Sequence, residues 1–147
     1  MLTCSFEDGQ KASLRHVVID TLVLKGDEIL LVKRIVKLLE GGKWGLIGGF
    51  VERDETIEQA AEREVLEETG YKVLGLKLLR VKDDPMRPNE DRQNIAFVYF
   101  CTAQEKVGEA DSESSEQRWF PFSALPPKEE VAFDHYDDIE FYLRSRR

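Results

Sequence analysis

The fold of this chain depends on TIEQAAEREVLEETG, residues 56–70, which carries the signals for both ends of one helix. The hydroxyl of Thr56 can accept a hydrogen bond in the first turn, and Gln59 three residues later completes a capping box. Gly70 is the residue type that commonly follows a helix in the left-handed conformation. The sequence therefore predicts a helix that begins at Thr56 and ends near Thr69.

The second half of this helix, EREVLEET (62–69), is dense in glutamate. Carboxylates there lie against the negative end of the helix dipole, and like charges four residues apart repel each other. At roughly 100° per residue, three carboxylates share the face of the small Ala60, and these are Glu64, Glu67 and Glu68. Two interpretations stay open at this point. The face is either solvated, or it holds Mg²⁺ through carboxylates together with substrate phosphates.

The other segments alternate between predicted strands and polar loops. VVIDTLVL (17–24) and EILLVKRI (28–35) are rich in apolar and β-branched residues and are joined by a turn, which predicts a hairpin. Strands are also predicted at 46–52, interrupted by Gly48-Gly49, and at 72–82, 94–103 and 118–122, with loops at 36–45, 83–93 and 105–117 and a final helix at 135–146. Strands around one helix, followed by a second helix, predict a mixed-sheet α/β domain.

Composition restricts the possible functions. The 147 residues predict a single domain over 1–147, and 41% hydrophobic content is typical of a globular protein. The net charge of −8 argues against a nucleic-acid partner, because nucleic-acid-binding surfaces are normally basic. No apolar run reaches the roughly 20 residues of a membrane span, and no signal peptide is apparent, so we expect no membrane partner and a cytoplasmic location. Cys4 and Cys101 are expected to be free thiols.

The spacing of residues from Gly49 onward resembles the Nudix box. Every fixed position of that motif is filled, by Gly49, Glu55, Arg63, Glu64, Glu67, Glu68 and Gly70. KWGLIGGF (43–50) and RWFPFSALP (118–126) resemble flanking segments of the same family, so most of 15–145 is covered. Ile47 departs from the family pattern, which commonly has proline there. Proline would fix φ in the turn before the two glycines.

The resemblance implies a Nudix-type α/β/α sandwich with a mixed central sheet and a loop-helix-loop catalytic motif. It also implies hydrolysis of a nucleoside diphosphate linked to another group, with Mg²⁺ or Mn²⁺ as cofactor. By this analogy the metal ligands are Glu64 and Glu68, with Glu67 as an additional or water-mediated ligand and the Gly48 carbonyl as a backbone ligand. Glu55 and Arg63 then have supporting roles, and Arg63 is expected to brace the loop-helix-loop without touching phosphate. Relatives of this type are often dimers, which implies a homodimer here.

The sequence offers several candidates for the general base. In this family the base is either a box glutamate, which would be Glu64, or a glutamate from a later loop. Glu113 has the placement of such a downstream carboxylate, and Glu116 is the reserve candidate. The alternative for both is a solvated acid in a polar loop.

The nucleotide is suggested by two further segments. DDPMRPNEDR (83–92) resembles the loop of ADP-ribose pyrophosphatases that carries proline and arginine, and FDH (133–135) resembles a segment of Nudix domains that handle ADP-ribose. Arg87 or Arg92 would then pair with a phosphate or with the terminal ribose region, although both also fit exposed loop arginines. Asp134 is expected to cap the final helix.

The leading hypothesis is therefore an ADP-ribose-type pyrophosphatase that releases AMP and ribose 5-phosphate from a small-molecule nucleotide. The alternative within the enzyme class is a hydrolase of (d)NTP or another nucleotide derivative. A Nudix module that senses a ligand without turnover is the alternative from a different class, and the intact box argues against it. The aromatic residues Phe97, Tyr99 and Phe133 are expected to pack in the core, and His135 to be structural.

Overall fold

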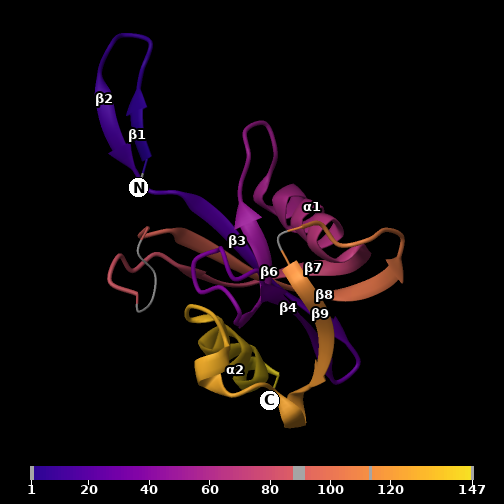
Figure 1. Cartoon of the computed structure of the whole chain (residues 1–147). Helices are drawn as coiled ribbons and strands as arrows, with labels where there is room; N and C mark the ends of the chain where they lie inside the picture. Colours follow the sequence, from indigo (N-terminus) through magenta and orange to yellow (C-terminus); the bar gives the residue numbers. More distant parts are fainter. Residues whose placement is uncertain (1, 88–91, 113, 147) are drawn as a thin grey trace.

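The computed structural model describes residues 2–87, 92–112 and 114–146, in which a mixed sheet lies between two helices (Figure 1). The helices are α1 (Ile57–Thr69) and α2 (His135–Ser145). The strands of the main sheet are β3 (Val17–Lys25), β4 (Glu28–Arg34), β5 (Trp44–Gly45), β6 (Ile47–Phe50), β7 (Tyr71–Lys82), β8 (Ile95–Lys106) and β9 (Ser114–Pro121). Two short 3-10 helices, η1 (Phe122–Ala124) and η2 (Lys128–Glu130), lie between β9 and α2.

The sheet has the strand order β5-β4-β3-β8-β7, with β6 also paired to β3 and β9 also paired to β4. The β3–β8 pair is parallel and the other ladders of this sheet are antiparallel. Parallel neighbours need a long connection, and here the chain between β3 and β8 includes β4, β5, β6, α1 and β7. The predicted hairpin of β3 and β4 is confirmed by direct pairing of Val23 with Leu30.

Each face of the sheet buries one helix. On one face, Leu22 and Leu24 of β3 belong to a core cluster with Ile139 of α2. On the other face, Val23 of the same strand lies in a cluster with Val65 of α1. This alternation follows from the two-residue period of a strand, and it confirms the predicted α/β/α sandwich.

Three differences from the sequence prediction concern strands. The Gly48-Gly49 pair does not interrupt β6, because both glycines pair with β3 in register. The polar loop predicted at 105–117 is shorter, since β8 continues to Lys106 and β9 begins at Ser114. A hairpin of β1 (Leu2–Ser5) and β2 (Lys11–Leu14) was not predicted; it forms a separate two-stranded sheet that projects from the body (Figure 1).

Two further expectations concern the thiols and the membrane. Cys4 and Cys101 are free, as predicted. Within the three described ranges, no helix is long and apolar enough to cross a membrane.

Candidate active site

The acidic helix α1 has both of its predicted ends. The Gln59 N–H donates to the Thr56 hydroxyl at 3.1 Å, and the Thr56 N–H donates to the Gln59 side-chain oxygen at 2.8 Å. Gly70 follows the helix with φ of 76°, a conformation that favours glycine. These local signals fix the start and the end of α1, and therefore which of its glutamates face the sheet.

Two glycines of β6 let the backbone approach the glutamates of α1. The Gly48 N–H donates to the Glu68 carboxylate at 2.9 Å, and Glu68 is only 8% exposed. A Cβ atom on Gly49 would lie 2.3 Å from the Glu64 carboxylate, so no larger residue fits beside it without moving that side chain. The strand and the helix thus form one unit, in which carboxylates face a glycine backbone.

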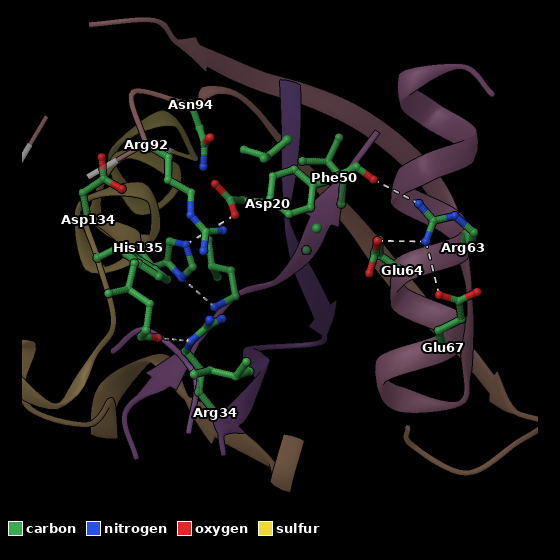
Figure 2. A pocket seen from close by; sticks show the side chains of 18 of the residues that line it. Asp20, Arg34, Phe50, Arg63, Glu64, Glu67, Arg92, Asn94, Asp134 and His135 are labelled. Atoms are coloured by element: carbon green, nitrogen blue, oxygen red, sulfur yellow. Dashed lines mark hydrogen bonds and ion pairs between the residues drawn. The ribbon is translucent and has the colours of Figure 1, made fainter. Parts of the chain in front are cut away.

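Arg63 connects the loop before α1 to the glutamates of the helix (Figure 2). Its guanidinium donates to Glu55 at 2.8 and 3.0 Å, to Glu64 at 2.8 Å and to Glu67 at 3.2 Å. It also donates to the carbonyl of Phe50 at 3.1 Å. This is the bracing arrangement expected from the sequence. Arg63 and Glu64 are consecutive on the helix and leave it in different directions, but the long arginine side chain reaches back to the Glu64 carboxylate.

Glu55 is held in its charged form. The hydrogen bond from Arg63, and next the one from the Glu52 backbone N–H, lower the pKa of Glu55 from 4.5 to about 2. The hydrogen bond to Glu55 outweighs burial and, with the contact to Glu64, raises the pKa of Arg63. Both side chains are therefore fully ionised near neutral pH, and Glu55 fixes the guanidinium that holds the two helix glutamates.

Replacement of this anchor has a pH-dependent effect on stability. Glu55→Gln is expected to lower the free energy of unfolding by about 1–2 kcal/mol near pH 7, because a hydrogen bond to a charged group is weakened. The folded-state pKa is depressed, so this stabilisation is complete above the unfolded pKa of 4.5 and is lost as pH falls towards about 2. Urea unfolding of the wild type and of Glu55→Gln at about pH 7 and about pH 3 measures the difference between their free energies of unfolding. This difference should be smaller at the lower pH. Glu58→Gln, which changes an exposed glutamate of the same helix, is the control. If wild type and Glu55→Gln differed in the free energy of unfolding by the same amount at both pH values, the depressed pKa of Glu55 would be contradicted.

The three predicted metal-binding glutamates do not form a ready-made ligand cluster. Among the described residues, no group of three or more Asp, Glu, His or Cys side chains is arranged to hold a metal ion. Glu64 and Glu67 are instead held by Arg63, while Glu68 accepts from Gly48. The donor chemistry still fits a hard divalent cation, since carboxylates from two successive turns of α1 lie against a glycine backbone.

A cleft of about 490 Å³ extends from Glu64 and Glu67 to the start of α2, and Glu68 does not line it (Figure 2). Its acidic wall includes Glu52, Glu64 and Glu67. The opposite end is lined by cationic, aromatic and amide side chains together with two acids, and these are Arg34, Arg87, Arg92, Phe133, Asn94, Asp20 and Asp134. The volume lies within the roughly 300–1,000 Å³ of typical small-molecule sites. The two ends suit a ligand with several phosphates and a polar organic part.

The two predicted substrate arginines differ in their surroundings. Arg87 lines the cleft, but its side chain is only 8% exposed and donates to Asp134 at 3.3 Å and to the Asn94 carbonyl at 3.1 Å. Arg92 is exposed, lies over the Phe50 ring at 5.9 Å and also lines the cleft. Arg92 is therefore better placed to meet a ligand, whereas Arg87 is largely engaged within the protein.

Of the two candidate bases from the later segment, the structure describes only Glu116. Glu113 lies outside the described residues. Glu116 forms an ion pair with Arg118 on β9 and does not line the cleft. Asp111, which the sequence analysis did not single out, does line the cleft, and its backbone N–H donates to the Glu67 carbonyl at 2.9 Å.

The remaining predictions concern three aromatic residues expected in the core and the expected cap by Asp134. Phe133 was expected in the core but lines the cleft, with the Arg34 guanidinium 5.0 Å from its ring. Tyr99 is buried and Phe97 packs against the cluster that contains Ala60, as predicted for both. The expected cap by Asp134 is wrong, because that side chain makes no cap hydrogen bond. It accepts from Lys82 at 2.8 Å and from Arg87 instead.

The amino-acid sequence is similar to those of several known proteins. The NUDIX domain family matches residues 14–139. An ADP-ribose pyrophosphatase from Methanocaldococcus jannaschii is 36% identical over 129 residues, which are 87% of this chain and 73% of that protein. The NAD-capped RNA hydrolase NudC from Pseudomonas aeruginosa is 35% identical over 127 residues, 85% of this chain but only 43% of that protein.

The fold is also similar to that of a solved structure. A bifunctional NMN adenylyltransferase/ADP ribose pyrophosphatase from Francisella tularensis, complexed with AMP and a Mn ion, has 28% identity and a TM-score of 0.70. The similarity covers 90% of this chain and 42% of that protein. The family match over most of the sequence and the relatives above 30% identity show that the chain belongs to the Nudix family of pyrophosphohydrolases.

Proposed function

We propose that this protein hydrolyses the pyrophosphate bond of ADP-ribose and releases AMP and ribose 5-phosphate. The observation that carries the proposal is one continuous cleft of about 490 Å³, which joins Glu64 and Glu67 of α1 to a cationic and aromatic end. The relative with 36% identity, named as an ADP-ribose pyrophosphatase, supports this choice of nucleotide.

We further propose that Mg²⁺, or Mn²⁺ in its place, binds at the glycine-facing side of α1. The ligands would be Glu64, Glu68 and Glu67, with the Gly48 carbonyl. Support comes from the carboxylates held against β6 and from the Mn ion in the similar Francisella structure. A bound divalent cation offsets phosphate charge and lowers the pKa of a bound water.

The protein's own groups then have separate tasks. Arg63, anchored by Glu55, keeps the carboxylates of Glu64 and Glu67 in place at the acidic wall. Arg92 faces the other end of the cleft, where a guanidinium can pair with a phosphate. Glu64 lines the cleft and is the group we assign to accept the proton of the attacking water. Glu113, as the alternative base, stays a prediction.

A substrate panel tests the choice of nucleotide. With Mg²⁺ present, the protein is expected to hydrolyse ADP-ribose at least about tenfold better, by kcat/KM, than nucleoside triphosphates or NAD, because a 1.4 kcal/mol difference in transition-state binding gives that ratio. Release of AMP, inorganic phosphate and pyrophosphate is measured for each compound. The NudC similarity makes NAD the informative competitor. Preference for NAD, or for triphosphates, would refute the ADP-ribose assignment while keeping a pyrophosphohydrolase. Tight ADP-ribose binding without any hydrolysis would favour a sensing module.

We also propose a homodimer formed through the hairpin of β1 and β2. The register places Leu2 opposite Leu14 and Cys4 opposite Ala12, so one hairpin face is apolar. Leu2 and Leu14 remain 47% and 43% exposed. An isolated two-stranded hairpin is marginally stable in water, and in a two-fold dimer the apolar faces of the two hairpins could cover each other.

The cytoplasmic location expected from the sequence stays a prediction.

Light scattering tests this association. The protein is expected to have the mass of a dimer, and Leu2→Ser with Leu14→Ser should convert it to the 17.0 kDa monomer because the shared apolar face is lost. Thr3→Ala on the opposite hairpin face is the matched control. A monomeric wild-type protein, or a dimer that survives the double substitution, would reject the interface.

A further inference from the structure

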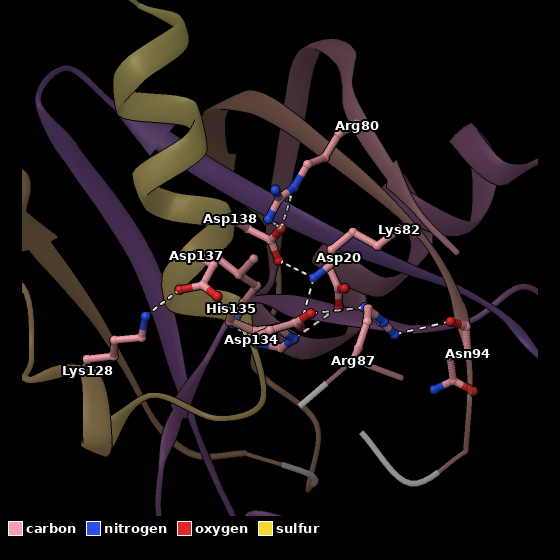
Figure 3. Close-up of polar contacts among 11 residues, drawn as sticks. Asp20, Arg80, Lys82, Arg87, Asn94, Lys128, Asp134, His135, Asp137 and Asp138 are labelled. Carbon is pink, nitrogen blue, oxygen red and sulfur yellow. Dashed lines mark hydrogen bonds and ion pairs between the residues drawn. The ribbon is translucent and has the colours of Figure 1, made fainter. Parts of the chain in front are cut away.

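His135 is buried at the start of α2, on the side of the cleft away from Glu64 and Glu67 (Figure 2), and lies beside Asp20 (Figure 3). Its ring is only 6% exposed, and its Nδ1 accepts a hydrogen bond from the Leu46 N–H at 3.0 Å. Leu46 lies directly between β5 and β6. An imidazole nitrogen that accepts from a backbone N–H carries no proton, so the ring proton is on Nε2.

The second ring nitrogen fixes this orientation. His135 Nε2 lies 3.3 Å from the Asp20 carboxylate, which comes from β3. The Asp20 carboxylate accepts from Nε2, and an acceptor at that position holds the imidazole with Nδ1 directed at Leu46.

The backbone beside His135 is attached to the same segment. The Ala132 N–H donates to the Trp44 carbonyl at 2.7 Å, and Trp44 forms a parallel bridge with Val131. A Cβ atom on Gly45 would lie 3.4 Å from His135 Nδ1, so the ring packs closely on this strand. The segment that precedes α2 thus holds the residues just before β6 by backbone and side-chain contacts.

Two residues after Leu46 comes Gly48, the backbone partner of Glu68. A Cβ on Gly48 would lie only 2.0 Å from the Ile19 carbonyl, and one on Gly49 would touch Glu64. Because this backbone has little free space on either side, a small displacement of Leu46 changes the position of Gly48 relative to the carboxylates.

Ile47 gives this contact particular importance. The Nudix pattern commonly has proline here, which would stiffen the turn before the glycines. In this chain Ile47 is fully buried and pairs with Thr21 of β3. The preceding residue, Leu46, is held by the His135 side chain. This contact restricts the backbone before the glycines, as a proline at position 47 would do by fixing φ.

We infer that His135 is a positioning residue for divalent-cation binding: through the Leu46 N–H it sets the Gly48-Gly49 backbone against the glutamates of α1. The inference rests on the metal site of the proposed function. His135 neither touches the substrate phosphates nor ligates the ion in this assignment. Its contribution appears as metal affinity, since residues that orient metal ligands commonly change affinity by about 10–100-fold.

Three substitutions separate the two hydrogen bonds of the ring. In His135→Asn the side-chain oxygen can replace Nδ1 and accept from Leu46. In His135→Gln the amide nitrogen can replace Nε2 and donate to Asp20, and His135→Leu removes both contacts. Mn²⁺ affinity is measured by calorimetry or electron paramagnetic resonance on the full chain, without substrate. We expect His135→Asn to stay within about threefold of wild type, and His135→Gln and His135→Leu to bind about tenfold or more weakly.

Controls keep this result distinct from general unfolding and from the proposed activity. Asp137→Asn changes an exposed side chain on the same helix turn, which pairs with Lys128, and should leave affinity unchanged. Thermal unfolding shows whether each variant is folded at the temperature of the titration, and only folded variants are compared. Equal affinities for the Asn and Gln variants, weaker binding by Asn than by Gln, or a loss in Asp137→Asn would each overturn the role of the Leu46 contact. A wild-type protein without Mn²⁺ binding would instead refute the metal site of the proposed function, and this inference with it.

Discussion

Glu68→Gln is expected to lower kcat/KM for ADP-ribose by roughly 10²–10³-fold, the usual size of losing one preorganised electrostatic group. The glutamine oxygen can still accept from the Gly48 N–H, whose present distance to the carboxylate is 2.9 Å, so the fold should be retained. What disappears is the negative charge at a buried position that is only 8% exposed. A buried charge faces little screening by water, and its loss weakens binding of a divalent cation more than loss of a surface charge would.

Glu62→Gln is the matched control for this substitution. Glu62 belongs to the same helix and is exposed on another face, so the change removes the same charge without altering the site. Steady-state rates at several Mg²⁺ concentrations, together with thermal unfolding, distinguish a metal effect from a folding effect. Wild-type activity in Glu68→Gln, or an equal loss in Glu62→Gln, would show that the buried carboxylate is not a metal ligand.

The parts of this site that the sequence predicted are those specified locally. Thr56 and Gln59 determine the start of α1 and Gly70 determines its end, each through contacts within one turn of the helix. Once the helix is fixed, its period decides that Glu68 faces the sheet and Glu62 faces solvent. No information from distant parts of the chain is needed for that step, which is why the acidic face could be deduced before the fold was known.

The other end of the cleft could not be deduced in the same way. Asp20 lies in an apolar strand and His135 at the start of the last helix, and only the pairing of β3 and the placement of α2 bring them to 3.3 Å. Arg87 and Asp134 meet for the same reason. A single acidic residue in a strand has no periodic pattern that marks it as part of a site.

The unpredicted strand lengths have a related cause. The end of β8 and the start of β9 are polar, so hydrophobic alternation does not identify them. Their pairing comes from neighbours, as where Lys33 of β4 lies opposite Glu116 of β9. In the same way, Gly48 and Gly49 read as an interruption because glycine weakens a strand, yet they are paired with β3.

The glycine pair itself leads to the second large effect. Gly48→Ala is expected to lower the free energy of unfolding by about 3 kcal/mol, at the upper end of overpacking costs, because the new Cβ would lie 2.0 Å from the backbone carbonyl of Ile19. That carbonyl belongs to the central strand β3 and cannot move without disturbing its ladders. Urea unfolding measures the loss, and little active protein should remain at elevated temperature.

Gly49→Ala should give the opposite balance between stability and activity. The three atoms nearest to its new Cβ all belong to the carboxylate of Glu64, the first at 2.3 Å, and a side-chain end can rotate away at low cost in folding. Moving that carboxylate by about 1 Å is enough to cost on the order of 10²-fold in rate. The two variants serve as each other's controls, since they differ by one position and add the same methyl group. If Gly49→Ala unfolds as readily as Gly48→Ala, or keeps wild-type turnover, then the close approach of β6 to Glu64 does not position the catalytic carboxylate. The expected contrast, a fold lost at one glycine and a rate lost at the next, follows from one contact being backbone and the other a side chain.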